Sequence, residues 1–102
     1  MTSVPSKIRR SSGDVFRDLG FDPAEAASLR LRSDLMTELS KVVRARRLTQ
    51  AKAATLFGVS QPRVSDLMRG HIDRFSVDTL VAMLGRAGLQ VRLVVKPRRS
   101  VA

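Results

Sequence analysis

Apolar residues recur at helical spacing through most of the chain and alternate with polar residues only near its end. Residues 23–46 are predicted to form one long helix that begins after Asp22, because an aspartate there accepts hydrogen bonds from the free N–H groups of the first turn. Ser33-Asp34 is a second potential start, so a break in this helix stays open. The buried stripe follows the helical period over Leu31, Leu35, Leu39 and Val42.

Residues 48–70 are predicted to form two short helices joined by a tight turn. Thr49 and Ser60 stand at the start of the first and the second helix, where a hydroxyl caps the first turn. Gly58 and Gly70 end the two helices, because glycine adopts the left-handed conformation of a helix end at little cost. Small residues in the first helix let the second cross it closely, which a helix-turn-helix requires.

The second of these helices, residues 61–69, is predicted to be a DNA-recognition helix. Val64 and Leu67 form its buried side, which leaves an outward face of polar side chains. On this face Gln61 can pair with adenine, and Arg63 can pair with guanine or a phosphate. The alternative is a helical hairpin whose polar face is only solvated.

A longer run of residues carries a resemblance to known proteins, and it consists of Leu48-Thr49-Gln50-Ala51, Ala54, Gly58-Val59-Ser60-Gln61-Pro62-Arg63-Val64-Ser65-Asp66-Leu67, Arg69-Gly70, Phe75-Ser76, Leu80 and Leu84. In this run the chain resembles the Cro/repressor (Xre-type) helix-turn-helix family, and it is most similar to the HigA-like antitoxins over residues 15–95. The resemblance implies an all-α, lambda-repressor-like bundle that binds operator DNA as a dimer and usually has a toxin as its neighbour. Lys52 departs from many relatives, which have glutamate there to complete a capping box.

The predicted DNA contacts combine the recognition helix with the start of the helix before it and the loop after it. Gln50 would bind a phosphate through its backbone N–H and side chain. In the resembling family the loop lies along the DNA backbone, which makes Arg74 a candidate for a phosphate or the minor groove. The full set of predicted contacts is Thr49, Gln50, Lys52, Ser60, Gln61, Pro62, Arg63, Ser65, Asp66, Arg69 and Arg74.

Three arginines, Arg44, Arg46 and Arg47, cluster where the long helix is predicted to end. The helix dipole favours positive charge there, and a phosphate contact is the alternative interpretation. Arg47 also occupies the position where a glycine would be expected to end the helix, so this helix end is less favourable than one with glycine.

Near the end of the chain, the helical period gives way to alternation. Leu89, Val91, Leu93 and Val95 occupy every second position, which predicts a half-buried strand over Leu89–Lys96. No second strand is visible in the sequence, and a lone strand leaves its backbone N–H and C=O groups unpaired. The strand is therefore predicted to pair with its copy in a two-fold homodimer, or with a strand of another protein.

The domain organisation follows from these elements. A chain of 102 residues is long enough for one small domain. Residues 1–13 are predicted to be a flexible basic arm and residues 97–102 a basic tail. Between them, residues 14–96 form the helix-turn-helix domain with its C-terminal strand, and its helix-turn-helix core covers residues 34–87.

The chain has a formal net charge of +10 and a pI of about 11.7, which implies an anionic partner, nucleic acid before a membrane surface. The absence of cysteine excludes disulfides and cysteine zinc sites. His71 is the only histidine, so we expect no metal and no cofactor. No apolar run approaches the roughly 20 residues that cross a bilayer, and we expect a cytoplasmic protein without a membrane partner.

These features predict a sequence-specific DNA-binding transcriptional regulator rather than an enzyme, because the acidic residues stand at helix starts and form no catalytic pair. The resemblance implies the antitoxin of a toxin–antitoxin pair, which neutralises a toxin and represses its own operon. A stand-alone phage-like repressor without a toxin partner is the alternative, and a basic RNA-binding protein is a more distant one.

Overall fold

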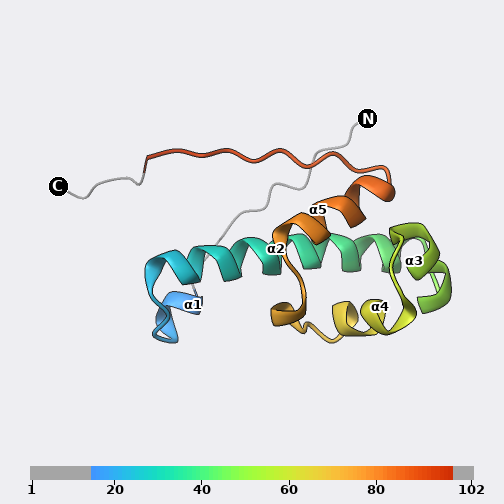
Figure 1. Cartoon of the computed structure of the whole chain (residues 1–102), viewed down its shortest axis with the longest axis horizontal. Coiled ribbons are helices and arrows are strands. Elements are labelled where there is room, and N and C mark those ends of the chain that lie inside the picture. Colours follow the sequence, from blue (N-terminus) through green and yellow to red (C-terminus); the bar gives the residue numbers. More distant parts are fainter. Residues whose placement is uncertain (1–14, 98–102) are drawn as a thin grey trace.

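The structure, a computed structural model, describes residues 15–97, and this part of the chain is helical (Figure 1). The predicted helical architecture is confirmed for these residues. The arm predicted over residues 1–13 lies outside the described residues, as does the tail predicted over residues 97–102 apart from Pro97. The elements in chain order are α1 (Val15–Asp18), α2 (Pro23–Ala45), α3 (Gln50–Phe57), α4 (Gln61–Met68), the 3-10 turn η1 (Ile72–Arg74) and α5 (Val77–Arg86).

Helix α2 is a single unbroken helix of 23 residues against which α1, α4 and α5 pack, while α3 packs mainly against α4 and α5. The Oδ2 atom of Asp22 accepts a hydrogen bond from the N–H of Glu25 at 3.1 Å, which confirms the predicted N-cap. The helix runs through Ser33-Asp34 without the break that the sequence left open. Continuity keeps Leu31 and Leu35 on one face, where both pack against the same core.

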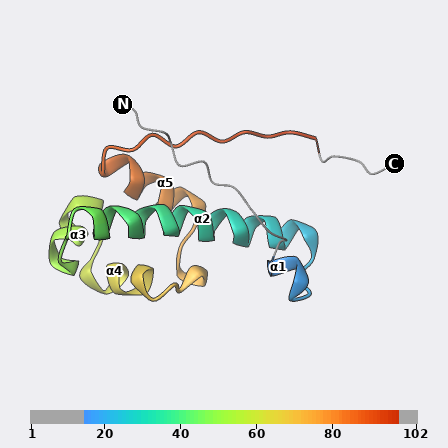
Figure 2. The same cartoon turned by 180° about the vertical axis from the view of Figure 1, so that it is seen from behind.

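The core lies at the C-terminal half of α2, where α3, α4 and α5 gather, while α1 packs at its N-terminal end (Figures 1 and 2). Because all four helices contribute to one cluster, side-chain packing fixes how α3 and α4 sit relative to each other. Phe75, in the link between η1 and α5, is also buried in this cluster. The largest fully buried side chains are Leu39, Phe57, Val64, Leu67, Leu80 and Met83.

Two arginines join the ends of helices through backbone carbonyl groups. The Nη1 atom of Arg86, on α5, donates to the carbonyl oxygen of Phe57 at 3.3 Å and so satisfies an acceptor at the end of α3. The Nη2 atom of Arg46, at the end of α2, donates to the carbonyl oxygen of Ala87 at 2.9 Å, just after α5. These bonds satisfy carbonyl groups that a helix end leaves without an intrahelical partner.

The strand predicted over Leu89–Lys96 is not formed in this single chain, because no strand occurs anywhere in residues 15–97. The segment runs out from the end of α5 as a long trace without regular hydrogen bonding (Figure 1). Val91 is half-buried against the core, but Leu93 is 58% exposed and Val95 is 86% exposed. A strand needs a second strand to pair its backbone groups, and the described residues provide none.

Candidate nucleic-acid interface

Two hydroxyl groups position the helices of the predicted helix-turn-helix. The Oγ1 atom of Thr49 accepts a hydrogen bond from the N–H of Lys52 at 3.1 Å, and the Oγ atom of Ser60 accepts one from the N–H of Arg63 at 3.3 Å. Both predicted N-caps are therefore confirmed. Gly58 has a φ of 71° between the two helices, in the left-handed region that the predicted turn requires.

Helix α4 has a buried side and an open side. Val64 is fully buried and Leu67 is 2% exposed, so these two residues define the direction of the core. A helix turns by roughly 100° per residue, which places Pro62 and Arg69 on the opposite side, away from the core. Both residues are exposed there, together with Gln61 on one flank. Of the remaining predicted contacts on α4, Ser65 and Asp66 are half-buried near this open side.

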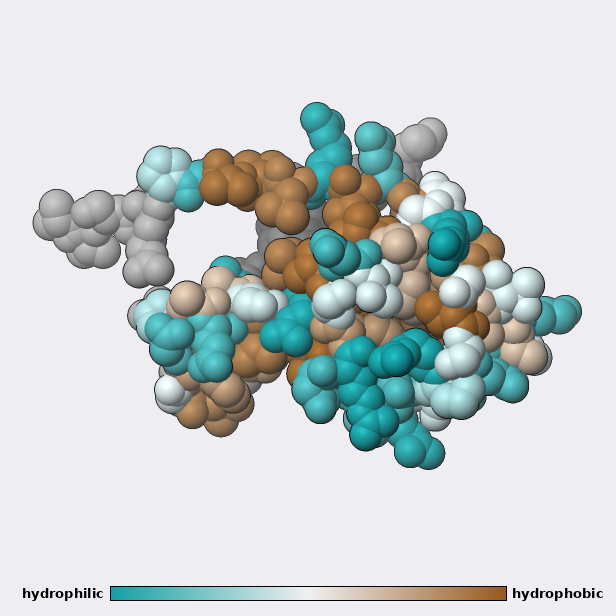
Figure 3. Space-filling view, in the orientation of Figure 1, coloured by the Kyte–Doolittle hydropathy of each residue, from teal (hydrophilic) through white to brown (hydrophobic). Residues whose placement is uncertain are grey.

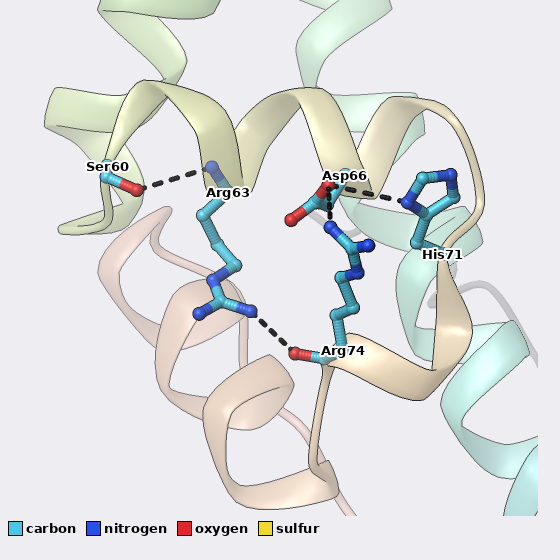
Figure 4. Close-up of polar contacts among 5 residues, drawn as sticks. All are labelled: Ser60, Arg63, Asp66, His71 and Arg74. Carbon is cyan, nitrogen blue, oxygen red and sulfur yellow. Dashed lines mark hydrogen bonds and ion pairs between the residues drawn. The ribbon is translucent and has the colours of Figure 1, made fainter.

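Arg63 lies on the other flank of α4 and is folded back toward the loop that follows the helix (Figure 4). Its Nη1 atom donates to the carbonyl oxygen of Arg74 at 2.8 Å, and its guanidinium lies 5.6 Å from the centre of the buried Phe75 ring. A cation over an aromatic ring at this distance is attracted to the ring face. In the free chain Arg63 therefore holds the loop to α4, a structural role that the sequence did not predict.

Asp66 and Arg74, both predicted to contact DNA, are paired with each other (Figure 4). The Oδ1 atom of Asp66 accepts a hydrogen bond from Nη1 of Arg74 at 3.1 Å, and Nδ1 of His71 lies 3.4 Å from the same oxygen. The Arg74 side chain is 53% exposed, and a pair with such exposure is worth no more than about 1 kcal/mol. DNA can therefore compete for Arg74 at little cost.

Arg32, on α2, also holds this loop. Its Nη1 atom lies 3.3 Å from the carbonyl oxygen of Ile72 and 3.4 Å from that of Phe75, and it donates to both. No local sequence pattern could have identified this contact, because residues about forty positions apart make it. The loop that carries Arg74 is therefore fixed by side chains from α2 and α4 together.

Three of the residues predicted to contact DNA have exposed side chains without a polar partner in the described part of the chain. Gln50 and Lys52 are exposed in the first turn of α3, and Arg69 is exposed at the C-cap of α4. Within residues 15–97 these side chains make no hydrogen bond or ion pair. Hydrophilic residues also cover the surface around α4 (Figure 3). Cationic and amide side chains that are free in this way can bind phosphates without breaking an existing contact.

Residues 15–97 contain no group of three or more acidic or histidine side chains arranged to hold a metal ion. Among the helices of this part of the chain, none combines the length and the apolar character needed to cross a membrane.

A family model described as a helix-turn-helix domain matches residues 15–96. The match extends from α1 through the segment after α5, so it covers most of the chain and not only the two helices around Gly58. No curated protein matches the chain. In helix-turn-helix proteins the second helix of the motif, which here is α4, enters the major groove of DNA.

Proposed function

Because the chain belongs to the helix-turn-helix domain family, we propose that this DNA-binding regulator is a sequence-specific repressor that inserts α4 into the major groove of operator DNA. The observation that carries the proposal is the open side of α4. A rigid helix, capped by Ser60 and packed through Val64 and Leu67, presents exposed polar side chains to solvent. A helix held in this way is already ordered, so binding in a groove costs it little conformational entropy.

The predicted contacts divide into residues that recognise the base sequence and residues that position the protein on the phosphate backbone. Gln61 is proposed to contact base edges, and adenine is its best partner because an amide matches that base in a bidentate pair. Pro62 and Ser65 extend this contact along the open side of α4. Asp66 and Arg63 contribute to base contacts only after release from Arg74. Phosphates are proposed to be bound by Gln50, Lys52, Arg69 and Arg74, while Thr49 and Ser60 act through the helix ends that they cap.

We also propose that the active form is a homodimer in which residues 89–96 pair as antiparallel strands with their copy. Three observations support this. The segment alternates in sequence, leaves Leu93 and Val95 exposed, and has no partner strand in the described part of its own chain. Two-fold pairing would satisfy its backbone groups and bury these side chains. The resulting dimer would place two α4 helices on half-sites about one helical turn apart.

An antitoxin role is the second part of the proposal, in which the protein works in the cytoplasm, neutralises a toxin and represses its own operon. It rests on the resemblance to HigA-like antitoxins and on one structural observation. Leu19 is 69% exposed and Phe21 is 40% exposed in the link between α1 and α2, at the far end of the domain from α4. A toxin could bind this apolar end without covering the recognition helix. Co-expression with the neighbouring gene tests the role: rescue of growth and co-purification support it, and a harmless neighbour favours a stand-alone repressor.

Selection from a pool of random duplexes tests the DNA-binding proposal. The sequence that the wild-type protein enriches, called here the selected duplex, is compared with a scrambled duplex of the same composition. Gln61→Ala is expected to lose about tenfold of this preference, because a bidentate base contact is worth about 1–3 kcal/mol. Binding to the scrambled duplex should stay the same, since its phosphate contacts are intact. Unchanged preference in Gln61→Ala would contradict the assignment of α4.

A further inference from the structure

All five α-helices of residues 15–97 end in the same backbone conformation. After each helix, one residue has a positive φ, and the next residue donates its N–H to a carbonyl five positions earlier. This is the Schellman ending, in which a left-handed residue lets the chain satisfy free carbonyl groups. The left-handed residues and their φ values are Gly20 (94°), Arg47 (52°), Gly58 (71°), Gly70 (76°) and Gly88 (87°).

Arg47 is the exception among these positions, because the other four are glycine. Its backbone contacts are those of a complete Schellman ending: the N–H of Arg47 bonds to the carbonyl of Arg44 at 3.1 Å, and the N–H of Leu48 bonds to that of Val43 at 2.9 Å. In this conformation a Cβ atom crowds the neighbouring carbonyl, and only glycine escapes the crowding. The fold therefore accepts strain at Arg47 that it avoids at every other helix end in residues 15–97.

The Arg47 side chain makes no contact that would explain this strain. It is exposed, and among the described residues it forms no hydrogen bond or ion pair. Arg46, its neighbour, differs because it donates to the carbonyl of Ala87. The dipole of α2 already has a basic residue in its last turn, Arg44. A strained backbone that supports no contact within its own chain points to a ligand outside it.

We propose that Arg47 is a phosphate-binding residue of the DNA interface, and that its charge is the reason why glycine does not occupy this helix end. The inference rests on the proposed DNA-binding function and extends it to a residue outside α4. Arg47 stands just before the N-cap Thr49, on the chain that leads into the exposed Gln50 and Lys52. It adds a guanidinium to the cationic and amide groups at the start of α3, where the helix N-terminus also attracts phosphate.

The test compares Arg47→Gly, Arg47→Ala and Arg47→Lys in the full chain, with Lys41→Gln as the control. Lys41 is exposed, pairs with Glu38, and lies on the side of α2 opposite to its core residues, so its variant removes one charge at a residue outside the proposed set of DNA contacts. Binding to the selected duplex is measured over a series of salt concentrations, and thermal unfolding is measured without DNA.

Arg47→Gly and Arg47→Ala are expected to reduce the slope of log affinity against log salt by about 0.9, the loss of one phosphate contact. Arg47→Lys and Lys41→Gln should keep the wild-type slope. Arg47→Gly should unfold at a higher temperature than Arg47→Ala, because it alone relieves the backbone strain. If Arg47→Gly is more stable than Arg47→Ala and still binds DNA more weakly than the wild type, the Arg47 side chain contacts the DNA and does not merely stabilise the fold.

A wild-type slope in Arg47→Gly would overturn the inference while leaving the DNA-binding function intact. The same would follow if Lys41→Gln lost as much slope as Arg47→Gly, since the effect would then come from net charge alone. If the wild-type protein enriches no duplex and shows no salt-dependent binding, the proposed function fails, and the assignment of Arg47 fails with it.

Discussion

The helix-turn-helix of residues 48–70 and the segment of residues 89–97 have equally clear sequence patterns and opposite outcomes in the structure. In the first region, caps, turn glycine and apolar positions are all satisfied within one chain. In the second, the alternating apolar residues are mostly exposed, and the backbone has no partner strand in the described part of the chain. A local pattern thus predicts the conformation that a segment favours, but burial depends on whether a partner surface is present.

The two regions therefore differ in whether their apolar side chains are buried within the chain or exposed to solvent. Phe57, at the end of α3, is fully buried in the core of its own chain. Leu93 and Val95 are exposed to water. The segment after α5 that carries them runs as an extended trace beside the helices (Figure 1). Exposed apolar surface of this extent on a small domain is typical of a surface that binds another molecule. We infer that the first region stabilises the monomer and that the second stabilises an assembly.

The largest expected effect comes from removing a buried ring from the first region. Phe57→Ala should lower the free energy of unfolding by about 3–5 kcal/mol, because it leaves a cavity in the core. Leu93→Ala, in the second region, should change monomer stability by less than about 0.5 kcal/mol. Urea unfolding at low protein concentration measures both values. Similar losses in the two variants would mean that residues 89–97 belong to the monomer core.

A charge in the second region should act on assembly and not on folding. Leu93→Glu is expected to weaken the dimer about 100-fold, because it removes buried apolar surface and places two like charges near the two-fold axis. Arg92→Gln changes a neighbouring exposed side chain that alternates to the other face, so it serves as the control. Sedimentation equilibrium measures the dissociation constant. A Leu93→Glu protein that dimerises like the wild type would exclude pairing through this segment.

A smaller effect is expected at the turn of the first region. In Gly58→Ala the new Cβ would meet the guanidinium of Arg86, and the left-handed φ of 71° adds backbone strain. We expect a loss of about 2 kcal/mol in unfolding free energy. Gly70→Ala is the matched control, because its φ is also positive but nothing lies within 4 Å of the new Cβ. Equal losses in both variants would show that the Arg86 contact contributes nothing.

Much of the fold was predictable because its signals are local. Asp22, Thr49 and Ser60 cap their own helices within three residues, and Gly58 determines its own turn. The unusual helix end at Arg47 was also visible, since glycine is the expected residue there. Periodicity identified the buried sides of α2 and α4 for the same reason, because a helix repeats within a few residues.

The parts of the site that could not be predicted depend on contacts between distant residues. Arg63 was expected to face DNA, but it bonds to the Arg74 carbonyl, and Asp66 pairs with the side chain of Arg74. The sequence gives no sign that Arg86 donates a hydrogen bond to a carbonyl group at the end of α3. An arginine has a long side chain with many donors, so its sequence position does not determine which acceptor it reaches. Such contacts appear only when the tertiary structure is known.

Selection of DNA by the wild-type protein and by a chain that ends at Gly88 tests both regions at once. Truncation at Gly88 keeps every residue of the buried core and removes the segment proposed to pair. We predict that the wild type enriches an inverted repeat with half-sites about one helical turn apart, and that the truncated chain enriches at most a single half-site. Failure of the wild type to enrich any sequence would contradict DNA recognition by α4, and an inverted repeat enriched equally by both chains would contradict pairing through residues 89–97.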